Sequence, residues 1–170
     1  FESLLLRDLA ELYFQTGEYE SGLETLRQGV SYYPDAARDM RMPLRMGAVF
    51  RSLFLNGRAD ELTPISAISL FYKFRQLTPL GSDGDLMIRR LADRLVSVDL
   101  LDRAAELLQY QVEARTEGAA RAQIASNLAK IYILSRQPEL AIQTLRATRE
   151  PRLPEDILGD RRHVEARALI

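Results

Sequence analysis

The sequence predicts an all-α protein made of antiparallel helix pairs. Three observations predict this class: apolar residues recur at helical spacing, small residues lie where a second helix would press on the first, and glycine or proline separates the segments. No stretch has the pattern of a strand ladder. We expect helices at about 2–16, 19–33, 41–56, 64–77, 85–98, 101–115, 118–135, 138–149 and 155–170.

The first helix pair has the clearest pattern. Gly22 and Gly29 lie seven residues apart on its second helix. Glycine costs roughly 1 kcal/mol relative to alanine inside a helix, so its presence there indicates a close helix contact. Gly17 suits the end of the first helix, where a left-handed residue is favoured. The apolar stripe of the first helix, at positions i, i+3, i+4 and i+7, consists of Leu6, Leu9, Ala10 and Tyr13.

The same arrangement of large and small residues recurs along the chain. A degenerate copy has a displaced first helix at about 41–56, and Thr63 with Pro64 marks the start of its second helix, which contains Ala67, Phe71 and Phe74. A clear copy follows with Ile88, Leu91, Ala92, Leu95, Leu101, Ala104 and Leu108. The last copy has Ala125, Leu128, Ala129, Tyr132, Ala141 and Leu145.

This pattern, closed in the first copy by Pro34, resembles the tetratricopeptide repeat, a helix–turn–helix unit of about 34 residues. The resemblance implies units at about 2–34, 41–79, 85–117 and 118–150, plus a final helix at 155–170. It implies a single domain over 1–170, in which the pairs stack into a right-handed superhelix, an α-solenoid. Because the chain opens on Phe1 and ends on Ile170 inside an expected helix, we expect it to be a fragment of a longer protein.

Composition limits the classes of function. No apolar run is long enough to span a membrane. The absence of cysteine excludes disulfides, cysteine–zinc sites and cysteine nucleophiles, and the net charge of −1 argues against a general nucleic-acid binder. The basic residues are almost all arginine, which indicates a GC-rich bacterial genome. We expect a soluble protein, with bacterial cytoplasm and periplasm both left open.

No group of residues indicates catalysis. His163 is the only histidine and has no second histidine or cysteine to share a metal with, so a surface or interface position is the better interpretation. The segment 79–85 lacks the spacing of a calcium loop, and Asp83 or Asp85 is expected to be a helix N-cap. We therefore expect no catalytic residue, no metal site and no cofactor, and a protein that is not an enzyme.

The resemblance implies a concave face, lined by the first helix of each unit, on which a peptide lies. In the first unit the lining positions are Leu4, Arg7, Asp8, Glu11 and Phe14. In the third and fourth units they also include Leu86, Gln123 and Ser126. The candidate peptide-binding groove between these two units consists of Arg89, Arg90, Asp93, Val96, Asn127, Lys130 and Ile133.

Charged donors over an apolar floor would suit an acidic or C-terminal peptide segment. The alternative is that Arg89 or Arg90 pairs with Asp93 within its own helix. Two functions remain open. The chain is either a non-catalytic module or scaffold that binds a partner protein or peptide, or a structural spacer that self-associates through uncapped repeat ends, for example around Val164 and Leu169.

Overall fold

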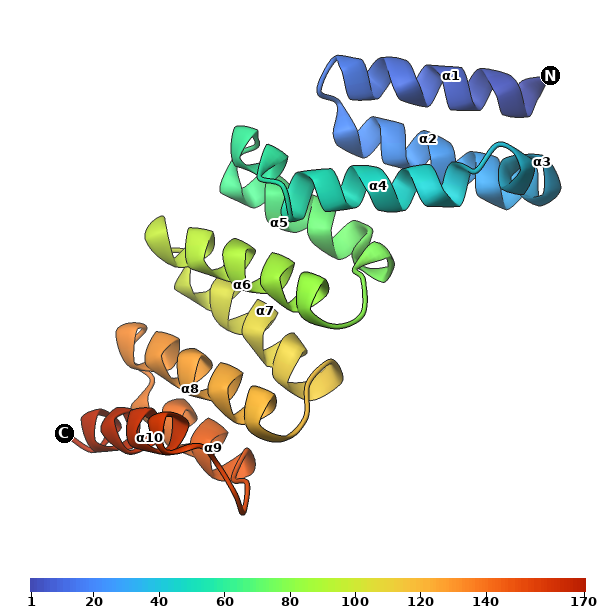
Figure 1. The fold of residues 1–170 in the computed structure, drawn as a ribbon. Helices are drawn as coiled ribbons and strands as arrows, with labels where there is room; N and C mark the ends of the chain where they lie inside the picture. The colour runs from blue at the N-terminus through green and yellow to red at the C-terminus, as the bar shows by residue number, and fades with distance from the viewer. The chain divides into compact units, whose positions relative to one another are not determined.

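The computed structural model describes residues 1–170 and is all-helical, with ten α-helices, two short 3-10 helices and no strand (Figure 1). The chain divides into two compact units, Phe1–Leu80 and Gly81–Ile170, here called unit 1 and unit 2. The all-α prediction is confirmed. None of the helices is long and apolar enough to cross a membrane.

Unit 1 begins with a helical hairpin. The helix α1 (Glu2–Gln15) has Thr16 as its C-cap, and Gly17 follows with a φ of +81°, the left-handed conformation expected after this helix. The next helix, α2 (Tyr19–Tyr32), carries the buried Gly22, and a Cβ added to this residue would lie 2.3 Å from Phe14 Cε1. The predicted close contact at Gly22 is therefore confirmed.

The rest of unit 1 surrounds an aromatic core. It comprises α3 (Pro34–Asp39), α4 (Met42–Phe54), η1 (Arg58–Glu61), α5 (Pro64–Lys73) and η2 (Arg75–Leu77). Phe50, Phe54 and Phe71 are buried with ring centroids 4.8–5.7 Å apart. The Thr63 hydroxyl accepts a hydrogen bond from Ser66 N at 3.2 Å, so Thr63 is the N-cap that the sequence predicts.

Two expectations for unit 1 are wrong, and one of its helices was not expected. Pro34 follows the end of α2, as predicted for the end of the first helix pair, but it also starts the short helix α3, because proline is well suited to the first helical turn. The helix expected at 64–77 ends at Lys73 and passes into η2. Leu9 is 42% exposed, since Ala10 and Phe14 form the buried side of α1 instead.

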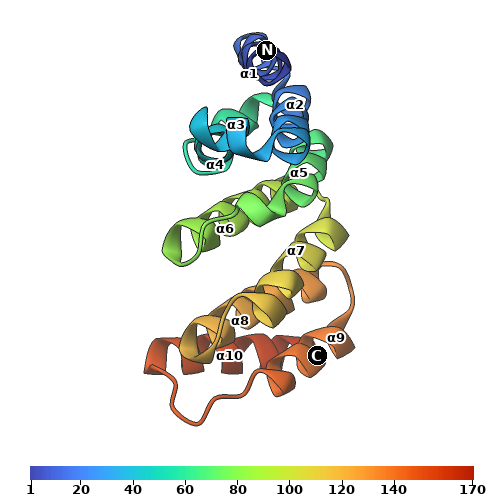
Figure 2. The ribbon, with the colours of Figure 1, turned by 90° about the vertical axis from the view of Figure 1, so that its right-hand side faces the viewer.

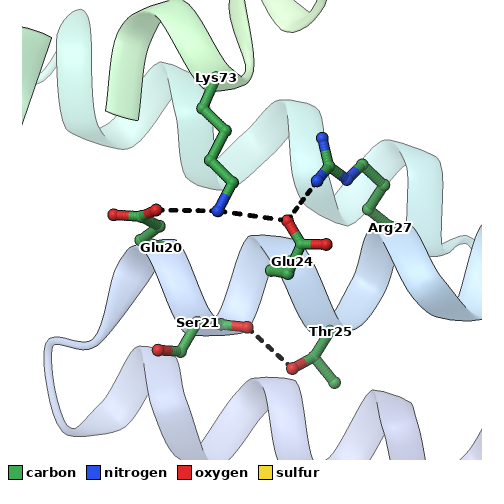
Figure 3. A network of polar contacts seen from close by, with 6 residues as sticks. All are labelled: Glu20, Ser21, Glu24, Thr25, Arg27 and Lys73. Carbon is green, nitrogen blue, oxygen red and sulfur yellow. Dashed lines mark hydrogen bonds and ion pairs between the residues drawn. The ribbon is translucent and has the colours of Figure 1, made fainter. Parts of the chain in front are cut away.

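A network of charged side chains joins α5 to α2 on the surface of unit 1 (Figure 3). Lys73 Nζ lies 2.9 Å from Glu20 Oε1 and 3.5 Å from Glu24 Oε2. Arg27 bonds Glu24 at 2.5 Å, and this hydrogen bond is the main reason why the pKa of Glu24 is lowered. The guanidinium of Arg27 also lies over the ring of Phe74, 5.3 Å from its centroid.

Unit 2 consists of five helices: α6 (Ser82–Ser97), α7 (Leu101–Ala114), α8 (Gly118–Leu134), α9 (Pro138–Ala147) and α10 (Glu155–Ala168). Each of α6 to α9 forms an antiparallel hairpin with the next helix, and α10 packs on α8 and α9 (Figure 2). Ala104 and Ala141 are fully buried, as predicted. Asp83 and Asp85 are not N-caps, because α6 already starts at Ser82, and they lie in its first turn.

Arg161 fastens α10 to the neighbouring helices. Its side chain is 7% exposed and donates to Ala122 O at 2.7 Å, Leu145 O at 2.6 Å and Thr148 O at 3.2 Å. Two of these carbonyls are at the C-terminal end of α9, where the helix dipole favours a cation. The buried guanidinium of Arg161 thus donates hydrogen bonds to carbonyls at the end of α9, where no further turn of the helix supplies N–H donors.

Candidate functional site

A groove of about 910 Å³ lies within unit 2. Its walls are α6 and α8, and its base is the buried side of α7. The helices α6 and α8 run in the same direction because each is antiparallel to α7 (Figure 1). The groove is lined by Ser82, Asp85, Leu86, Arg89, Asp93, Val96, Leu108, Gln111, Ala120, Gln123, Ile124, Asn127, Lys130, Ile131 and Leu134.

The lining positions follow from helical spacing. On α6 they run from Ser82 through Arg89 to Val96, and on α8 from Ala120 through Asn127 to Leu134, as single residues or adjacent pairs that recur every three or four residues. Such steps place side chains on one face of a helix. The two faces bring apolar and polar side chains into the same groove.

The base of the groove holds a polar contact. Gln111 is 2% exposed, and its Nε2 donates to Asp85 Oδ1 at 3.3 Å. Arg115 Nε lies 3.7 Å from the same oxygen. The other atom of this amide, Gln111 Oε1, is buried and accepts no hydrogen bond from the protein. The carboxylate of Asp85 therefore already has contacts with two side chains of the protein, Gln111 and Arg115.

The middle of the groove carries polar side chains without protein partners. Arg89 and Asp93 are exposed on α6, and no hydrogen bond or ion pair holds either of them. The expected alternative, an ion pair of Asp93 with Arg89 or Arg90 in the same helix, is not formed. Asn127, on α8, is half-buried and likewise makes no hydrogen bond to the protein.

Lys130 also lines the groove, but its charge is already paired. Its Nζ lies 2.8 Å from Asp160 Oδ1 of α10, and Ser126 Oγ donates to the other carboxylate oxygen at 2.5 Å. Burial works to raise the pKa of Asp160, but the hydrogen bonds from Lys130 and Ser126 outweigh it and lower the pKa. Lys130 therefore ties α8 to α10 as well as facing the groove.

Two of the residues predicted for the groove lie elsewhere. Ile133 packs against the cluster formed by α8, α9 and α10, which contains Ala141 and Val164. Arg90 is exposed but does not line the groove, because it is rotated by about 100° from Arg89 on the helix. Arg89, Asp93, Val96, Asn127 and Lys130 do come together there.

The prediction missed several apolar members of the groove. Ile124 lies three residues before Asn127, and Ile131 and Leu134 lie four and seven residues after it. The helical stripe that contains Asn127 was therefore the signal that could have found them. Gln111 and Leu108 carried no such signal, because they belong to the intervening helix α7.

Unit 1 has a smaller pocket in which two charged side chains pair with each other. This pocket, of about 310 Å³, lies between α1 and α4. Arg45 donates two hydrogen bonds to Glu11, at 2.6 and 2.7 Å, and lies over the Phe14 ring at 5.4 Å. The hydrogen bonds with Glu11 raise the pKa of Arg45. Glu11 and Phe14 thus line this pocket, but the Glu11 carboxylate already has its partner.

The titratable residues offer no metal centre. No group of three or more His, Asp or Glu side chains is arranged to hold a metal ion, and His163 is exposed on α10. The comparisons with known proteins add no assignment: no protein-family model, curated protein or solved structure matches this chain.

Proposed function

We propose that this chain is a non-catalytic interaction module and that unit 2 binds an extended segment of a partner protein in the groove between α6 and α8. The observation that carries the proposal is the combination of apolar walls with three polar side chains, Arg89, Asp93 and Asn127, that no protein group satisfies. Sites of this kind bury apolar groups and fix orientation with a few polar contacts.

Each part of the groove has a chemical use for a peptide. The amide of Asn127 can donate and accept at once, which suits a peptide group of the partner's backbone. Arg89 can hold a carboxylate with two parallel hydrogen bonds. Val96, Ile131 and Leu134 form an apolar end that can take a side chain out of water.

The family and the wider architecture belong to the same proposal. The helical hairpins α1–α2, α6–α7 and α8–α9 carry the buried small residues Gly22, Ala104 and Ala141 at corresponding places on their second helices. This repetition supports a tetratricopeptide-type array, in which pairs stack into a right-handed solenoid.

A selection from a random peptide library, displayed against the purified chain, tests the proposed function. The selected peptides should shift the NMR resonances of α6 and α8, and the variant Arg89→Ala, Asn127→Ala should lose most of the affinity. The matched control is Gln143→Ala, Arg146→Ala, which removes the same kinds of side chain from the exposed face of α9. Equal losses in both variants, or resonance shifts confined to other helices, would contradict the proposal.

One observation favours the second candidate, a spacer that self-associates. Leu5, Leu9 and Leu12 are 52%, 42% and 57% exposed and fall on one side of α1, at i, i+4 and i+7. An exposed apolar stripe of this kind is typical of a helix that packs against another surface. The test is to measure the oligomeric state of the wild type and of the double variant Leu5→Lys, Leu12→Lys by size-exclusion chromatography. A monomeric variant beside an oligomeric wild type would support this function, and two monomeric proteins would exclude it.

A further inference from the structure

We infer that the groove selects partner segments in which an acidic residue, a basic residue and an apolar residue occupy alternate positions in that order, from the Ser82 end of the groove to the Leu134 end. The inference rests on the proposed function, because it names the chemistry of the segment that the groove would bind. It concerns which peptides bind, whereas the proposed function concerns whether peptides bind at all.

The two charges on α6 that lack partners set the first two positions. Arg89 and Asp93 both face the groove, neither is paired, and they are one helical turn apart, which is about 6 Å along the axis. Side chains on one face of an extended chain are about 6.6 Å apart, because successive residues rise by about 3.3 Å and point to opposite faces. An extended segment therefore presents an acidic side chain to Arg89 and a basic one, two residues away, to Asp93.

The other charges that line the groove are already neutralised. Lys130 is paired with Asp160, and Asp85 is held by Gln111 with Arg115 close by. The charges left for a ligand are one cation and one anion, in a fixed order along α6. This arrangement complements a segment with both signs of charge and gives a purely acidic segment only one partner.

The apolar end sets the third position. Val96 is almost one turn beyond Asp93 on α6, and Ile131 and Leu134 face it from the last turn of α8. Leu134 is 55% exposed, so an apolar side chain placed there would cover surface that water now contacts. A peptide residue two places beyond the basic one reaches this end in the same extended conformation.

The test is an exchange of the two charges. The variant Arg89→Asp, Asp93→Arg keeps the net charge and the composition of the helix face but reverses the order. Two peptides are compared, each with leucine as the apolar residue: one has glutamate four places and lysine two places from the leucine, and the other has these two residues exchanged. Both are made with the leucine at either end of the charged pair, since the chain direction of the segment is free.

We expect the wild type to prefer the first peptide by about tenfold, because two exposed ion pairs replace two like-charge contacts. The exchanged variant should prefer the second peptide by a similar factor. Both preferences should shrink at about 1 M salt, where exposed charges are screened. Circular dichroism of the variant serves to show that its helices are retained.

The outcomes separate the inference from the proposed function. If the wild type binds peptides in the groove without preferring either charge order, or if both proteins prefer the same order, the inference is wrong and the interaction module stands. If the library selection yields no peptide that binds α6 and α8, the proposed function itself fails.

Discussion

In unit 1 a cluster of phenylalanines forms the core, whereas unit 2 contains no phenylalanine and buries alanine, leucine and an arginine. Phe50, Phe54 and Phe71 pack with their rings in contact, and no charged side chain is buried in unit 1. In unit 2, by contrast, Arg161 is buried and Asp160 is hydrogen-bonded to two residues of α8. The docking of α10 therefore depends on polar contacts as well as on the apolar cluster that contains Val164, while the helices of unit 1 are held mainly by apolar packing.

The pockets of the two units differ in the same way. Glu11 and Arg45 satisfy each other in unit 1, but Arg89 and Asp93 in the groove of unit 2 have no partner. A paired charge gains little from a ligand, because the ligand must first displace the internal partner. The comparison supports the proposal that the groove of unit 2 is the binding site, and it predicts that the two units respond differently to mutation, pH and salt.

The largest effect is expected for Arg161→Leu. This change removes every donor that Arg161 gives to Ala122, Leu145 and Thr148, and should destabilise unit 2 on the order of 3 kcal/mol. Hydrogen exchange measured by mass spectrometry should show lost protection in α8, α9 and α10, with α1 and α2 nearly unchanged. Arg162→Leu, at the exposed neighbouring position, is the control and should leave exchange as in the wild type. Equal exchange in the two variants would show that α10 is held by its apolar contacts alone.

Gly22→Leu tests the packing of unit 1. The new side chain would meet the Phe14 ring, which is buried between α1 and α2, and should cost roughly 1–3 kcal/mol through overpacking. The loss should appear in the exchange of α1 and α2 and not in that of unit 2.

Gly47→Ala is the matched control for that prediction. Gly47 lies inside α4, and nothing lies within 4 Å of a Cβ added there. Alanine should therefore stabilise the helix by up to about 1 kcal/mol. We therefore expect Gly22→Leu to lower the free energy of unfolding and Gly47→Ala to raise it. If both substitutions lowered it, helical glycine in unit 1 would have a role other than close packing.

Much of the fold could be predicted from local spacing. Gly22, Ala104 and Ala141 were found because close helix packing selects small residues at fixed intervals, and Thr63 because an N-cap is a local hydrogen bond. The helix α3 was missed because Pro34 suits both a helix start and the end of a repeat. Leu9 was wrongly expected on the buried side of α1, because a stripe of apolar residues is several residues wide and does not define which of its edges faces the core.

The site could be predicted in part. The faces of α6 and α8 follow from periodicity, so Arg89, Asp93 and Asn127 were placed correctly. The pairing of Lys130 could not be predicted, because Asp160 lies in α10, outside the repeated pattern and far along the chain. The tertiary structure decides which charges remain unpaired, so this could not be predicted from the spacing of residues along the sequence.

Asp160→Asn should change the response of unit 2 to acid. Because the folded state lowers the pKa of Asp160, this residue contributes stability above the ordinary carboxyl pKa of about 4, and the contribution is lost as the pH falls through the folded value. Wild-type α10 should lose protection as the pH falls below about 4, whereas the variant, already about 1 kcal/mol less stable at neutral pH, should change less. Unit 1 is the internal reference, and a pH response of α10 that is the same in both proteins would assign the acid sensitivity to other carboxylates.

The smallest effects are expected from the only two lysines, each of which joins two helices of one unit. Lys73→Met should cost less than about 1 kcal/mol, because the pair is exposed and Glu24 keeps its contact with Arg27. Lys130→Met should cost more, since Asp160 then keeps only the hydrogen bond from Ser126 and its charge is less well compensated. Chemical denaturation with urea at low and high salt, read by hydrogen exchange in each unit, measures both losses. The Lys73 effect should vanish at about 1 M salt, where surface pairs are screened, while part of the Lys130 effect persists. A larger loss for Lys73→Met than for Lys130→Met would reverse the comparison, because it would mean that the polar contacts of unit 1 carry more stability than those that dock α10.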